Sequence, residues 1–523
     1  MEYKILITTS GVGQRLGDLT KYTNQSLVRV GRKPVISYII EAYPKFVPLV
    51  ITTGYFGNHV EDFVKLAYPD RKITFVRVPK YQGPGTSLGY SMLQARKHLQ
   101  CPFIFHAADT IVQDVVPLPK NNWIGGFKGH DASQYASWNV LETDQYVFNE
   151  KGAIDFDYIH IGLVGIKDYR GFWKHLESLF KKAPNDSSLN DCKVIVRMLE
   201  DKAKFKMMDF KTWHDIGNVN ALEETRKVIS DHFDNLHKVD ESIFILKDRV
   251  IKFFHDPKNV TGRVKRQKLL GNLVPKLLGY FDNFYSYEFV EGDLYSRAVD
   301  PTDFAKFLEW AKTNLWKPKK VKDMKKFQEI CRGFYETKTE ERVQKFFKVN
   351  NLPDEKHVIN GEQVPTVKEM LKKIDFASLS RAKPYQFHGD FILDNILKTK
   401  DGYCLLDWRQ HFGGLYEAGD MYYDLAKLNH NLTVNHDIIH QDLMSIKNDG
   451  THIRVDINRS ENLVQCQKVL MDFIDKNGYD LEKVETLTAI IWLNMSPLHH
   501  YPFNIFLYYF GKLNLWRVIK KYQ

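Results

Sequence analysis

Cysteine is scarce in this sequence, and its few copies follow no pattern. The 523 residues include five cysteines, an odd number, with no CxxC pair and no cysteine–histidine cluster. They are scattered as Cys101, Cys192, Cys331, Cys404 and Cys466. This spacing indicates neither a disulfide framework nor a zinc site. Reduced thiols are typical of the cytoplasm, and we therefore expect a cytoplasmic protein.

Long hydrophobic runs are also missing. No apolar stretch approaches the roughly 18 residues that a membrane-spanning helix requires, so we expect no membrane span. The opening MEYKILITTS is too short, and too acidic at its start, for a secretory signal. We interpret it as a first strand. The sequence shows no internal repeat and no low-complexity tract.

Acidic residues are outnumbered by basic ones. The chain has 74 lysines and arginines against 64 aspartates and glutamates, which gives a net charge of +10. Such an excess suits nucleic-acid binding or the handling of polyphosphates, and a basic solvated surface is an equally good explanation. Nucleic-acid recognition would need an aromatic–basic stripe or a recognition motif, and the sequence contains none. We therefore expect no nucleic-acid partner.

The length of the chain requires more than one hydrophobic core. Hydrophobic residues make up 43% and charged residues 26%, which is ordinary for a globular protein. A helix is predicted at 221–239, and the pattern of the sequence changes after it. We place a boundary there, which gives an N-terminal domain over 1–235 and a C-terminal domain over 236–523.

Short apolar segments alternate with helix-like segments through the N-terminal domain. Strands are predicted at 3–9, 48–55, 72–78 and 102–109, and helices at 33–43, 59–68 and 87–99. Alternation of strand and helix indicates an α/β fold, with a mostly parallel sheet covered by helices on both faces.

The C-terminal domain begins differently. Two strand pieces are predicted within 242–254 and two more within 276–295, which outlines a small β-rich lobe over about 240–295. From about 296 to 523 the pattern is mainly helical and is interrupted only at 385–415. A bilobal fold is expected.

Two glycines directly follow the first strand, in SGVGQRLG. Gly11 and Gly13 are followed by Arg15, and a dinucleotide-binding fingerprint would have its third glycine where Leu16 stands. Glycines after a strand let backbone N–H groups approach phosphate, and an arginine nearby can neutralise a triphosphate. A tight turn without a ligand is the alternative.

Five motifs over about 1–225 stand in the order found in sugar nucleotidyltransferases, which this part of the chain resembles. After GxGxRL come GRKP at 31–34, QGPGTSLGYSM at 82–92, a strand ending on Asp109, and TWHDIGN at 212–218. The resemblance implies a Rossmann-like nucleotidyltransferase fold with a mixed, mostly parallel sheet. It also implies a catalytic role for Arg15 and contacts to the nucleotide from Gly11, Gly13, Gln25, Gly85 and Thr86.

The same resemblance implies that Asp109 and Asp215 bind Mg²⁺. A substrate phosphate must attack the α-phosphorus of a nucleoside triphosphate, so cationic groups are needed between two anions. Magnesium prefers carboxylate oxygen. For either aspartate taken alone, a strand-end cap or a surface position is the alternative.

Gln25 departs from the family, which has a phosphate-binding lysine ten residues after the arginine. Glutamine can form a hydrogen bond but brings no charge, and losing a charge-assisted contact in the transition state slows a reaction strongly. Nucleotidyl transfer is then slow, absent, or rescued by a neighbouring cation. The candidates are Arg29, Arg32 and Lys33.

A second constellation lies in FHGDFILDNIL and the CLLDWR that follows it. Asn395 stands five residues after Asp390, and Asp407 seventeen after it. In phosphoryl transfer to an alcohol, a carboxylate orients and deprotonates the hydroxyl, and Mg²⁺ bridges the ATP phosphates. A loop aspartate, an amide and a strand-end aspartate supply the necessary groups, as they do in protein kinases.

These motifs resemble the aminoglycoside and choline kinase-like phosphotransferases, over about 240–520. The resemblance implies that Asp390 is the catalytic base and that Asn395 and Asp407 hold Mg²⁺. Supporting roles are implied for three further side chains, with His388 bracing the loop and the pair Asp420 and Asp424 in GDMYYDLAKL acting as structural anchors.

The ATP contacts of this resemblance fall in the small lobe. Lys252 in DRVIKFF stands where the family has a phosphate-binding lysine, although a surface strand lysine is an equally good explanation. Glu288 in YEFVEGDLY stands at the hinge between lobes, where backbone groups meet adenine. The helix that should offer a pairing glutamate, VTGRVKRQKLLGN, holds no acid.

Together the two resemblances predict a bifunctional enzyme that uses ATP, CTP or UTP and Mg²⁺. It would phosphorylate a small alcohol or sugar and couple the phosphate to a nucleotide, giving a precursor for surface polysaccharide such as a bacterial capsule. A kinase with a nucleotide-binding but catalytically weak N-terminal domain is the alternative. The aromatic residues at 501–509 could form a cage for a quaternary amine, but their spacing favours a helix core.

Overall fold

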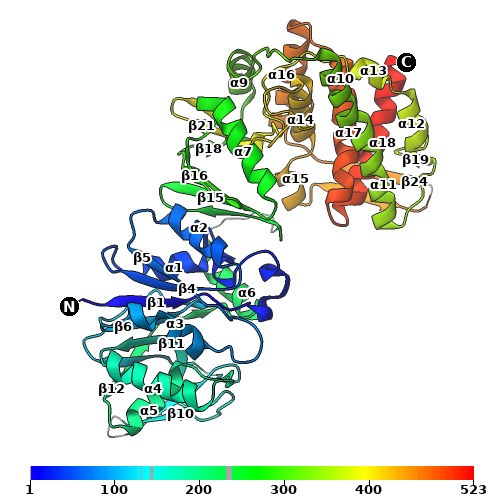
Figure 1. Ribbon diagram of the computed structural model, residues 1–523. Coiled ribbons are helices and arrows are strands. Elements are labelled where there is room, and N and C mark those ends of the chain that lie inside the picture. The colour runs from blue at the N-terminus through cyan, green and yellow to red at the C-terminus, as the bar shows by residue number, and fades with distance from the viewer. Residues whose placement is uncertain (1, 130, 142–144, 231–237, 451) are drawn as a thin grey trace. The chain divides into compact units, whose positions relative to one another are not determined.

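The strands predicted in the first 110 residues form one side of a large sheet (Figure 1). In spatial order, this parallel part comprises β6 (Phe103–Ala107), β1 (Lys4–Thr8), β4 (Leu49–Thr53) and β5 (Ile73–Arg77). β1 lies between β4 and β6, and the register places Thr8 opposite Ala107. The carboxyl ends of β1 and β6 therefore meet at one edge of the sheet, which is where α/β folds bind ligands.

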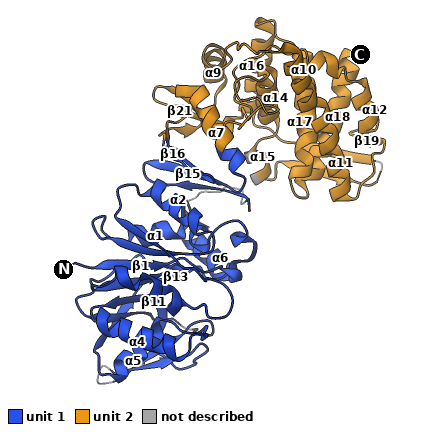
Figure 2. Cartoon of the chain, in the orientation of Figure 1, with its two compact units in different colours: residues 1–260, 278–289 blue, residues 261–277, 290–523 orange. Residues whose placement is uncertain are grey.

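The structure is a computed structural model that describes residues 2–129, 131–141, 145–230, 238–450 and 452–523. The chain divides into two compact units (Figure 2). Unit 1 holds residues 1–260 and 278–289, and unit 2 holds residues 261–277 and 290–523. The strands expected in the small lobe thus fall in unit 1. A functional boundary between 235 and 236 stays a prediction.

The rest of the large sheet is mixed. Its remaining strands are β8 (Asn122–Phe127), β9 (Ser137–Val140), β10 (Tyr146–Asn149), β11 (Tyr158–Ile166) and β12 (Phe205–Phe210). β11 is antiparallel to β6, β8 and β9, whereas β12 is parallel to β8. An α/β fold with a mixed, parallel-rich sheet is therefore confirmed for this part of the chain.

Helices cover both faces of this sheet, as the alternating pattern predicts. Ile5 and Ile7 of β1 point into a core shared with α1 (Val35–Glu41) and α2 (Gly57–Ala67). Leu6 points into a second core shared with α3 (Leu88–Ala95), α4 (Tyr169–Lys182) and α5 (Asp191–Glu200). A strand that is apolar at every position is expected when both of its faces are buried.

The helix predicted at 221–239 is α6 (Val219–Val228). It starts two residues early and ends at Val228, where Ile229 caps it. Residues 231–237 of the predicted helix lie outside the described residues.

Four further strands of unit 1 match the strands predicted for the small lobe. They are β14 (Glu241–Ile245), β15 (Arg249–Phe254), β16 (Leu277–Tyr280) and β17 (Phe284–Glu288). The sheet packs on α2 through buried rings: the Phe63 ring centroid lies 5.1 Å from that of Phe244 and 6.3 Å from that of Phe284. The three phenylalanines belong to the same core as Ile5 and Ile7 of β1.

Unit 2 is mainly helical (Figure 1). Its centre is formed by α14 (Met421–Thr433), α17 (Leu481–Met495) and α18 (Phe503–Tyr522). Around them lie α9 (Pro301–Asn314), α10 (Met324–Arg332), α11 (Lys338–Asn350), α12 (Val367–Lys373), α13 (Phe376–Leu379), α15 (His436–His440) and α16 (Glu461–Lys476). Four of the C-terminal aromatics, Phe503, Phe506, Tyr508 and Tyr509, are buried in this core, as the helix-core interpretation predicts.

The expectation that helices are interrupted only at 385–415 is wrong. A four-stranded sheet joins β19 (His357–Ile359), β20 (Glu362–Val364), β23 (Met444–Asn448) and β24 (His452–Ile457). The first two strands are joined by Asn360 and Gly361, which both have positive φ angles. Asn-Gly is the strongest short hairpin signal in a sequence, and it was present in VINGEQV.

Within the described part of the chain, no helix combines the length and the apolar character that crossing a membrane requires. The five cysteines are all free.

Candidate active sites

The glycine loop after β1 closes around the side chain of Gln25. Gly13 has φ +69°, and a Cβ at this position would lie 2.8 Å from the Gln25 Cβ and 2.9 Å from its Oε1. A larger residue at Gly13 is therefore excluded by conformation and by space. The predicted nucleotide residues Gly13 and Gln25 are thus direct neighbours, and Gly11 lies beside them, with its built Cβ 3.8 Å from the Gln25 Nε2.

Asn24 holds Gln25 in this position. It is fully buried, and its amide donates to the Thr9 carbonyl at 2.8 Å and to the Tyr55 carbonyl at 2.7 Å. Its oxygen accepts from the Ser26 backbone N–H at 2.9 Å. All of its hydrogen-bonding groups are engaged, so this short turn is rigid. The sequence analysis assigned Asn24 no role.

Asp109, Asp215 and Arg15 converge on one point. β13 (His214–Asp215) pairs with β7 (Thr110–Ile111), and this pairing carries Asp215 across to the residue after Asp109. A Cβ on Gly217 would lie 3.0 Å from Arg15 Nη2, 3.1 Å from Asp215 Oδ1 and 3.2 Å from Asp109 Oδ2. The structure therefore brings together two carboxylates and a guanidinium that are up to 200 residues apart in sequence.

The two carboxylates repel one another. Burial and the charge of Asp215 raise the pKa of Asp109 to about 6, although Arg15 partly opposes this. Asp215 is held by the Tyr135 hydroxyl, which donates to its Oδ2 at 2.9 Å, and by the Gly217 N–H, which donates to its Oδ1 at 2.9 Å. Two adjacent carboxylates of this kind fit a divalent cation with oxygen ligands. Tyr135 was missed, because a tyrosine in DASQYASW carries no pattern.

The second glycine loop lies at the start of α3. Gly85 has φ +81°, and its built Cβ would lie 3.1 Å from the Asn185 Oδ1 and 3.3 Å from the Lys80 Nζ. The Thr86 hydroxyl donates to the Gly83 carbonyl at 2.7 Å. This loop is tied to the first one, because Ser91 of α3 shares a hydrogen bond of 2.8 Å with Ser10.

In unit 2, a hairpin places Asn395 and Asp407 side by side. β21 (Ile396–Thr399) and β22 (Gly402–Leu405) pair with Ile396 opposite Leu405, so the residues that flank the hairpin meet at its open end. The Leu406 N–H donates to the Asn395 carbonyl at 2.7 Å. Asp407 itself has φ +52°, a conformation that costs free energy in any residue except glycine.

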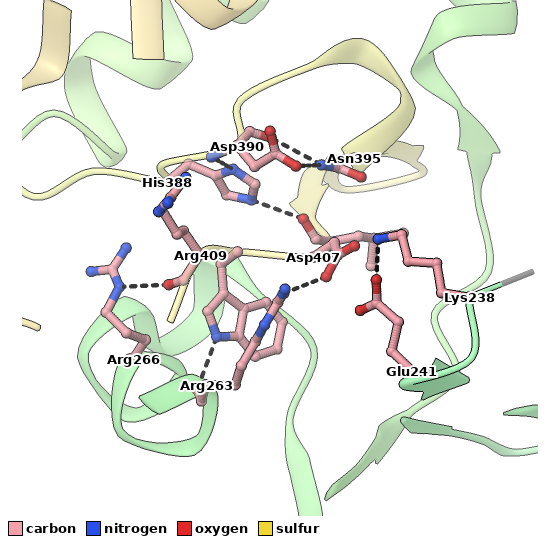
Figure 3. A network of polar contacts seen from close by, with 11 residues as sticks. Lys238, Glu241, Arg263, Arg266, His388, Asp390, Asn395, Asp407 and Arg409 are labelled. Atoms are coloured by element: carbon pink, nitrogen blue, oxygen red, sulfur yellow. Dashed lines mark hydrogen bonds and ion pairs between the residues drawn. The ribbon is translucent and has the colours of Figure 1, made fainter. Parts of the chain in front are cut away.

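Asp390 lies next to this pair (Figure 3). The Asn395 amide donates to the Asp390 backbone carbonyl at 2.9 Å and to its Oδ2 at 3.3 Å. The negative charge of Asp407 also acts to raise the pKa of Asp390, which indicates that the two carboxylates are close. The three side chains that the sequence singled out therefore surround one small region.

His388 and Asp424 fix the loop that carries Asp390. His388 is buried, its Nε2–H donates to the Leu406 carbonyl at 2.8 Å, and burial lowers its pKa to about 4, so the ring is neutral. Asp424 accepts from the backbone N–H groups of His388 and Gly389, both at 2.7 Å. The anchoring roles expected of these two side chains agree with these contacts.

Each carboxylate of this site has a cationic partner that sequence analysis missed. Arg263 of α7 (Pro257–Leu270) forms an ion pair with Asp407. The Lys427 Nζ lies 2.8 Å from the Asp390 Oδ1. Burial alone would raise the pKa of Asp390, but the Lys427 ammonium more than offsets it, and this pKa lies below its usual range.

Asp420, the other expected anchor, caps α14. Its carboxylate accepts from the Tyr335 hydroxyl at 2.8 Å and pairs with the Lys483 Nζ at 2.7 Å, and all three groups are buried. These contacts join α14 to α17 and to the turn before α11.

The two residues predicted to contact ATP lie in the small sheet of unit 1. Lys252 is a buried residue of β15 and stands opposite Tyr285. Glu288 ends β17 and stands opposite Arg249. Their role in binding ATP stays a prediction.

One further group of possible metal ligands occurs among the described residues, namely His160, Asp191 and Cys192. The Trp138 indole donates to His160 Nδ1 at 3.2 Å, and His160 Nε2 donates to Asp191 at 2.9 Å. Burial raises the pKa of Cys192 well above its usual range. With both ring nitrogens engaged and the thiol protonated, this group fits a structural role.

Solved structures similar to part of this chain include three nucleotidyltransferases. The CTP:phosphocholine cytidylyltransferase of Streptococcus pneumoniae is 15% identical, with 44% of this chain and 99% of that chain covered and a TM-score of 0.36. A UDP-glucose pyrophosphorylase in complex with UDP-glucose is 16% identical (44% and 98%, TM-score 0.35). The inositol-1-phosphate CTP transferase of T. maritima is also 16% identical (44% and 96%, TM-score 0.36).

No protein-family model matches the chain, and no curated protein matches it. Identities and TM-scores as low as these indicate nothing about activity, which has to be argued from the side chains of the two sites.

Proposed function

We propose that this chain is a bifunctional enzyme that first phosphorylates a small alcohol or sugar with ATP and then couples the phosphate to CTP or UTP. The observation that supports the second step is the convergence of Asp109, Asp215 and Arg15 at Gly217. The observation that supports the first is the grouping of Asp390, Asn395 and Asp407 at the end of one hairpin. The product would be a nucleotide-activated precursor for surface polysaccharide, made in the cytoplasm.

In the N-terminal site, a phosphate oxygen of the acceptor attacks the α-phosphorus of the triphosphate and pyrophosphate leaves. The backbone N–H groups near Gly11 and Gly13 bind the triphosphate, with Gln25 as a neutral hydrogen-bonding neighbour. The Arg15 guanidinium offsets negative charge that develops during the reaction. Asp109 and Asp215 would hold Mg²⁺, because they are two facing carboxylates that repel each other without a cation.

In the C-terminal site, the acceptor hydroxyl loses its proton to Asp390 as its oxygen attacks the γ-phosphorus of ATP. The bond between that phosphorus and the bridging oxygen breaks, and ADP leaves with the electron pair. Asn395 and Asp407 would hold Mg²⁺ here. In either site the bound metal supplies positive charge to phosphate oxygens. His388 and Asp424 keep the loop in place, and Lys252 and Glu288 would meet ATP.

One observation favours the alternative, a kinase with a weak N-terminal domain. Gln25 occupies the space beside the glycine loop where the resembled family has a lysine, and it carries no charge. The triphosphate would then bind with little acceleration of transfer.

The test measures both products that the 523-residue protein forms. ATP and a panel of sugars, polyols and hydroxy acids are supplied first, and CTP or UTP is then added to whatever phosphomonoester forms. We expect Asp109→Ala to abolish pyrophosphate release and leave ADP formation intact. Asp390→Asn should abolish ADP formation and leave pyrophosphate release from the premade phosphomonoester intact.

Other outcomes separate the two functions. If ADP forms but neither CTP nor UTP releases pyrophosphate, the kinase would be the only activity of the two that the protein has. If ADP formation persisted in Asp390→Asn at the rate of the unchanged protein, the proposed kinase site would be wrong.

A further inference from the structure

Next to Asp390, unit 2 holds a cluster of four basic side chains that the proposed reaction does not use. Lys338 and Arg342 come from α11, Arg409 from the loop after β22, and Lys427 from α14. Two of them are tied to the catalytic loop. Lys427 pairs with Asp390, and the Arg409 backbone N–H donates to the His388 carbonyl at 3.0 Å. The cluster therefore lies where an acceptor would approach the base.

Aromatic rings, rather than acidic side chains, hold these cations. The Lys338 Nζ lies 4.0 Å from the ring centroid of Phe334 and 5.7 Å from that of Tyr423. The Arg409 guanidinium carbon lies 5.1 Å from the Phe334 centroid. Contacts of this kind orient a cation but leave its charge uncompensated.

Phe334 and Lys338 are presented by an irregular turn. Residues Gly333–Thr337 form a π-helical turn between α10 and α11, and Lys338 is the first residue after it. Such turns cost stability and often occur at functional sites. This one places a ring and an ammonium side by side.

The charges of the cluster do not cancel. Among the described residues, Lys338, Arg342 and Arg409 have no carboxylate within ion-pair distance, and the Arg409 Nε is buried without a hydrogen-bond partner. Burial lowers the pKa of Lys338 well below its usual range, and the charges of Arg409, Arg342 and Lys427 lower it further. The negative charge of Asp390 opposes this shift. A bound anion would relieve this repulsion.

We propose that the acceptor phosphorylated in unit 2 is an anionic hydroxy compound, whose carboxylate or phosphate binds Lys338, Arg342 and Arg409 while its hydroxyl meets Asp390. This inference rests on the proposed kinase function and specifies its substrate class. A quaternary amine is disfavoured, because the Arg342 and Arg409 guanidinium groups would repel it and because four of the C-terminal aromatics are buried in the core. Arginine suits this task, since its planar fork binds two oxygens at once.

The experiment compares acceptors that differ in charge, with the 523-residue protein and Mg-ATP. One set is glycerol, glycerate and glycerol phosphate, and a second is glucose, gluconate and glucose 6-phosphate. Choline and ethanolamine represent cations. We expect ADP formation with at least one anionic compound, with kcat/KM exceeding that of its neutral partner by roughly 100-fold. Comparing the carboxylate with the phosphate in each set identifies which anion is bound.

Variants separate acceptor binding from nucleotide binding. Lys338→Met and Arg342→Met should each raise the KM for the anionic acceptor by roughly 10- to 100-fold and change the KM for ATP by less than about threefold. Lys345→Met, an exposed lysine of the same helix, is the matched control and should change neither. Calorimetric titration of glycerate, gluconate and the two phosphate esters into the protein measures binding without turnover.

The possible results are distinct. Phosphorylation confined to neutral or cationic acceptors overturns this inference and leaves the kinase function standing. A rise in the KM for ATP alone in Lys338→Met also overturns this inference, because the cations would then bind the nucleotide and not the acceptor. Absence of calorimetric binding by all four anions overturns the inference as well. A different result would refute the kinase function instead. In that result no compound supports ADP formation, although the protein binds an anion and Lys338→Met weakens this binding.

Discussion

Arg263 on α7 forms an ion pair with Asp407, the carboxylate expected to hold Mg²⁺ in unit 2. The same helix carries Arg266, which is fully buried and donates to the carbonyls of Arg409 at 3.3 Å and Tyr416 at 3.1 Å. α7 is thus held to the loop after β22, and it presents the Arg263 guanidinium to the Asp407 carboxylate. A metal ion at Asp407 would have to share this carboxylate with a guanidinium.

The first prediction follows from this pair. Arg263→Gln removes a positive charge beside Asp407, so divalent metal should bind there about tenfold more tightly when no nucleotide is present. Electron paramagnetic resonance of Mn²⁺ in an Asp109→Asn background isolates this site. Lys268→Gln, an exposed position of the same helix, serves as the control and should leave affinity unchanged. Equal or weaker binding in Arg263→Gln would contradict the prediction.

Gly217→Ala tests the convergence point in unit 1. The added methyl group would lie about 3 Å from Arg15, Asp215 and Asp109 at once, so these groups must move apart by a few tenths of an ångström. We expect pyrophosphate release to fall about 100-fold, because small misplacements of reacting groups are costly. ADP formation should be unchanged. Val219→Ala, two residues on and partly exposed, should have no effect, and an equal loss in both variants would refute the geometric explanation.

Metal binding in unit 1 should depend on pH. The pKa of Asp109 is raised to about 6, by burial first and by Asp215 second, so this carboxyl takes up a proton as the pH falls through 6. A metal ion must displace that proton. Affinity is therefore expected to be flat above about pH 7 and to fall by up to tenfold per unit below 6. Calorimetric titration of Mg²⁺ between pH 5 and 8, in an Asp407→Asn background, measures the affinity of the unit 1 site at each pH.

A second variant checks the cause of this pH dependence. Asp215→Asn removes the neighbouring charge, so the midpoint of the pH dependence should move toward the usual range of a carboxyl group. A midpoint that stays near 6 would assign the whole effect to burial.

Gln25→Lys decides between a slow and an inactive N-terminal site. A lysine beside the glycine loop would bring positive charge to the triphosphate, and we expect pyrophosphate release to rise about tenfold. Gln25→Met, of similar size and without hydrogen-bonding groups, is the control and should slow release or leave it unchanged. If release in Gln25→Lys stays at the background level, the view of the N-terminal domain as a binding module gains support.

Asp424→Asn should destabilise unit 2. The carboxylate accepts two backbone N–H groups and the Trp316 indole at 3.2 Å, and an amide would turn an N–H donor toward some of these donors. A loss of about 2–4 kcal/mol in unfolding free energy is expected, together with loss of ADP formation. Urea denaturation followed by fluorescence measures it. Asp472→Asn, at an exposed site on α16, should behave like the unchanged protein.

The sequence predicted the carboxylates of both sites and Arg15 of the N-terminal site, and it missed the cations beside the carboxylates of unit 2. Asp109 lies two residues after the end of β6, and Asp390 with Asn395 lies in one short loop, so local patterns are sufficient to find them. Arg263 is 144 residues from its partner Asp407, and Lys427 reaches Asp390 from a different helix. Only the packing of α7 and α14 brings these groups together, and no local pattern encodes it.

The same reasoning explains the errors in the fold. The alternating strands of unit 1 were found because each is apolar on both faces and is bounded by turns. The sheet of β19, β20, β23 and β24 was missed, because its strands are short, half exposed and placed among longer helices. Its Asn360-Gly361 turn was the available signal, and the surrounding helical pattern obscured it.

The contact of Phe63 with Phe244 and Phe284 has a consequence for how this polypeptide can be divided. The strands proposed to receive ATP complete a hydrophobic core that begins with the very first strand. In a fragment that starts at residue 236, Phe244 and Phe284 would be exposed to water, and we expect this fragment to aggregate. In a fragment that ends at residue 235, Phe63 of α2 would lose both of these ring contacts. The strands that carry Lys252 and Glu288 therefore depend on the N-terminal core for their folding, so a substitution that weakens this packing should also disturb the proposed ATP contacts.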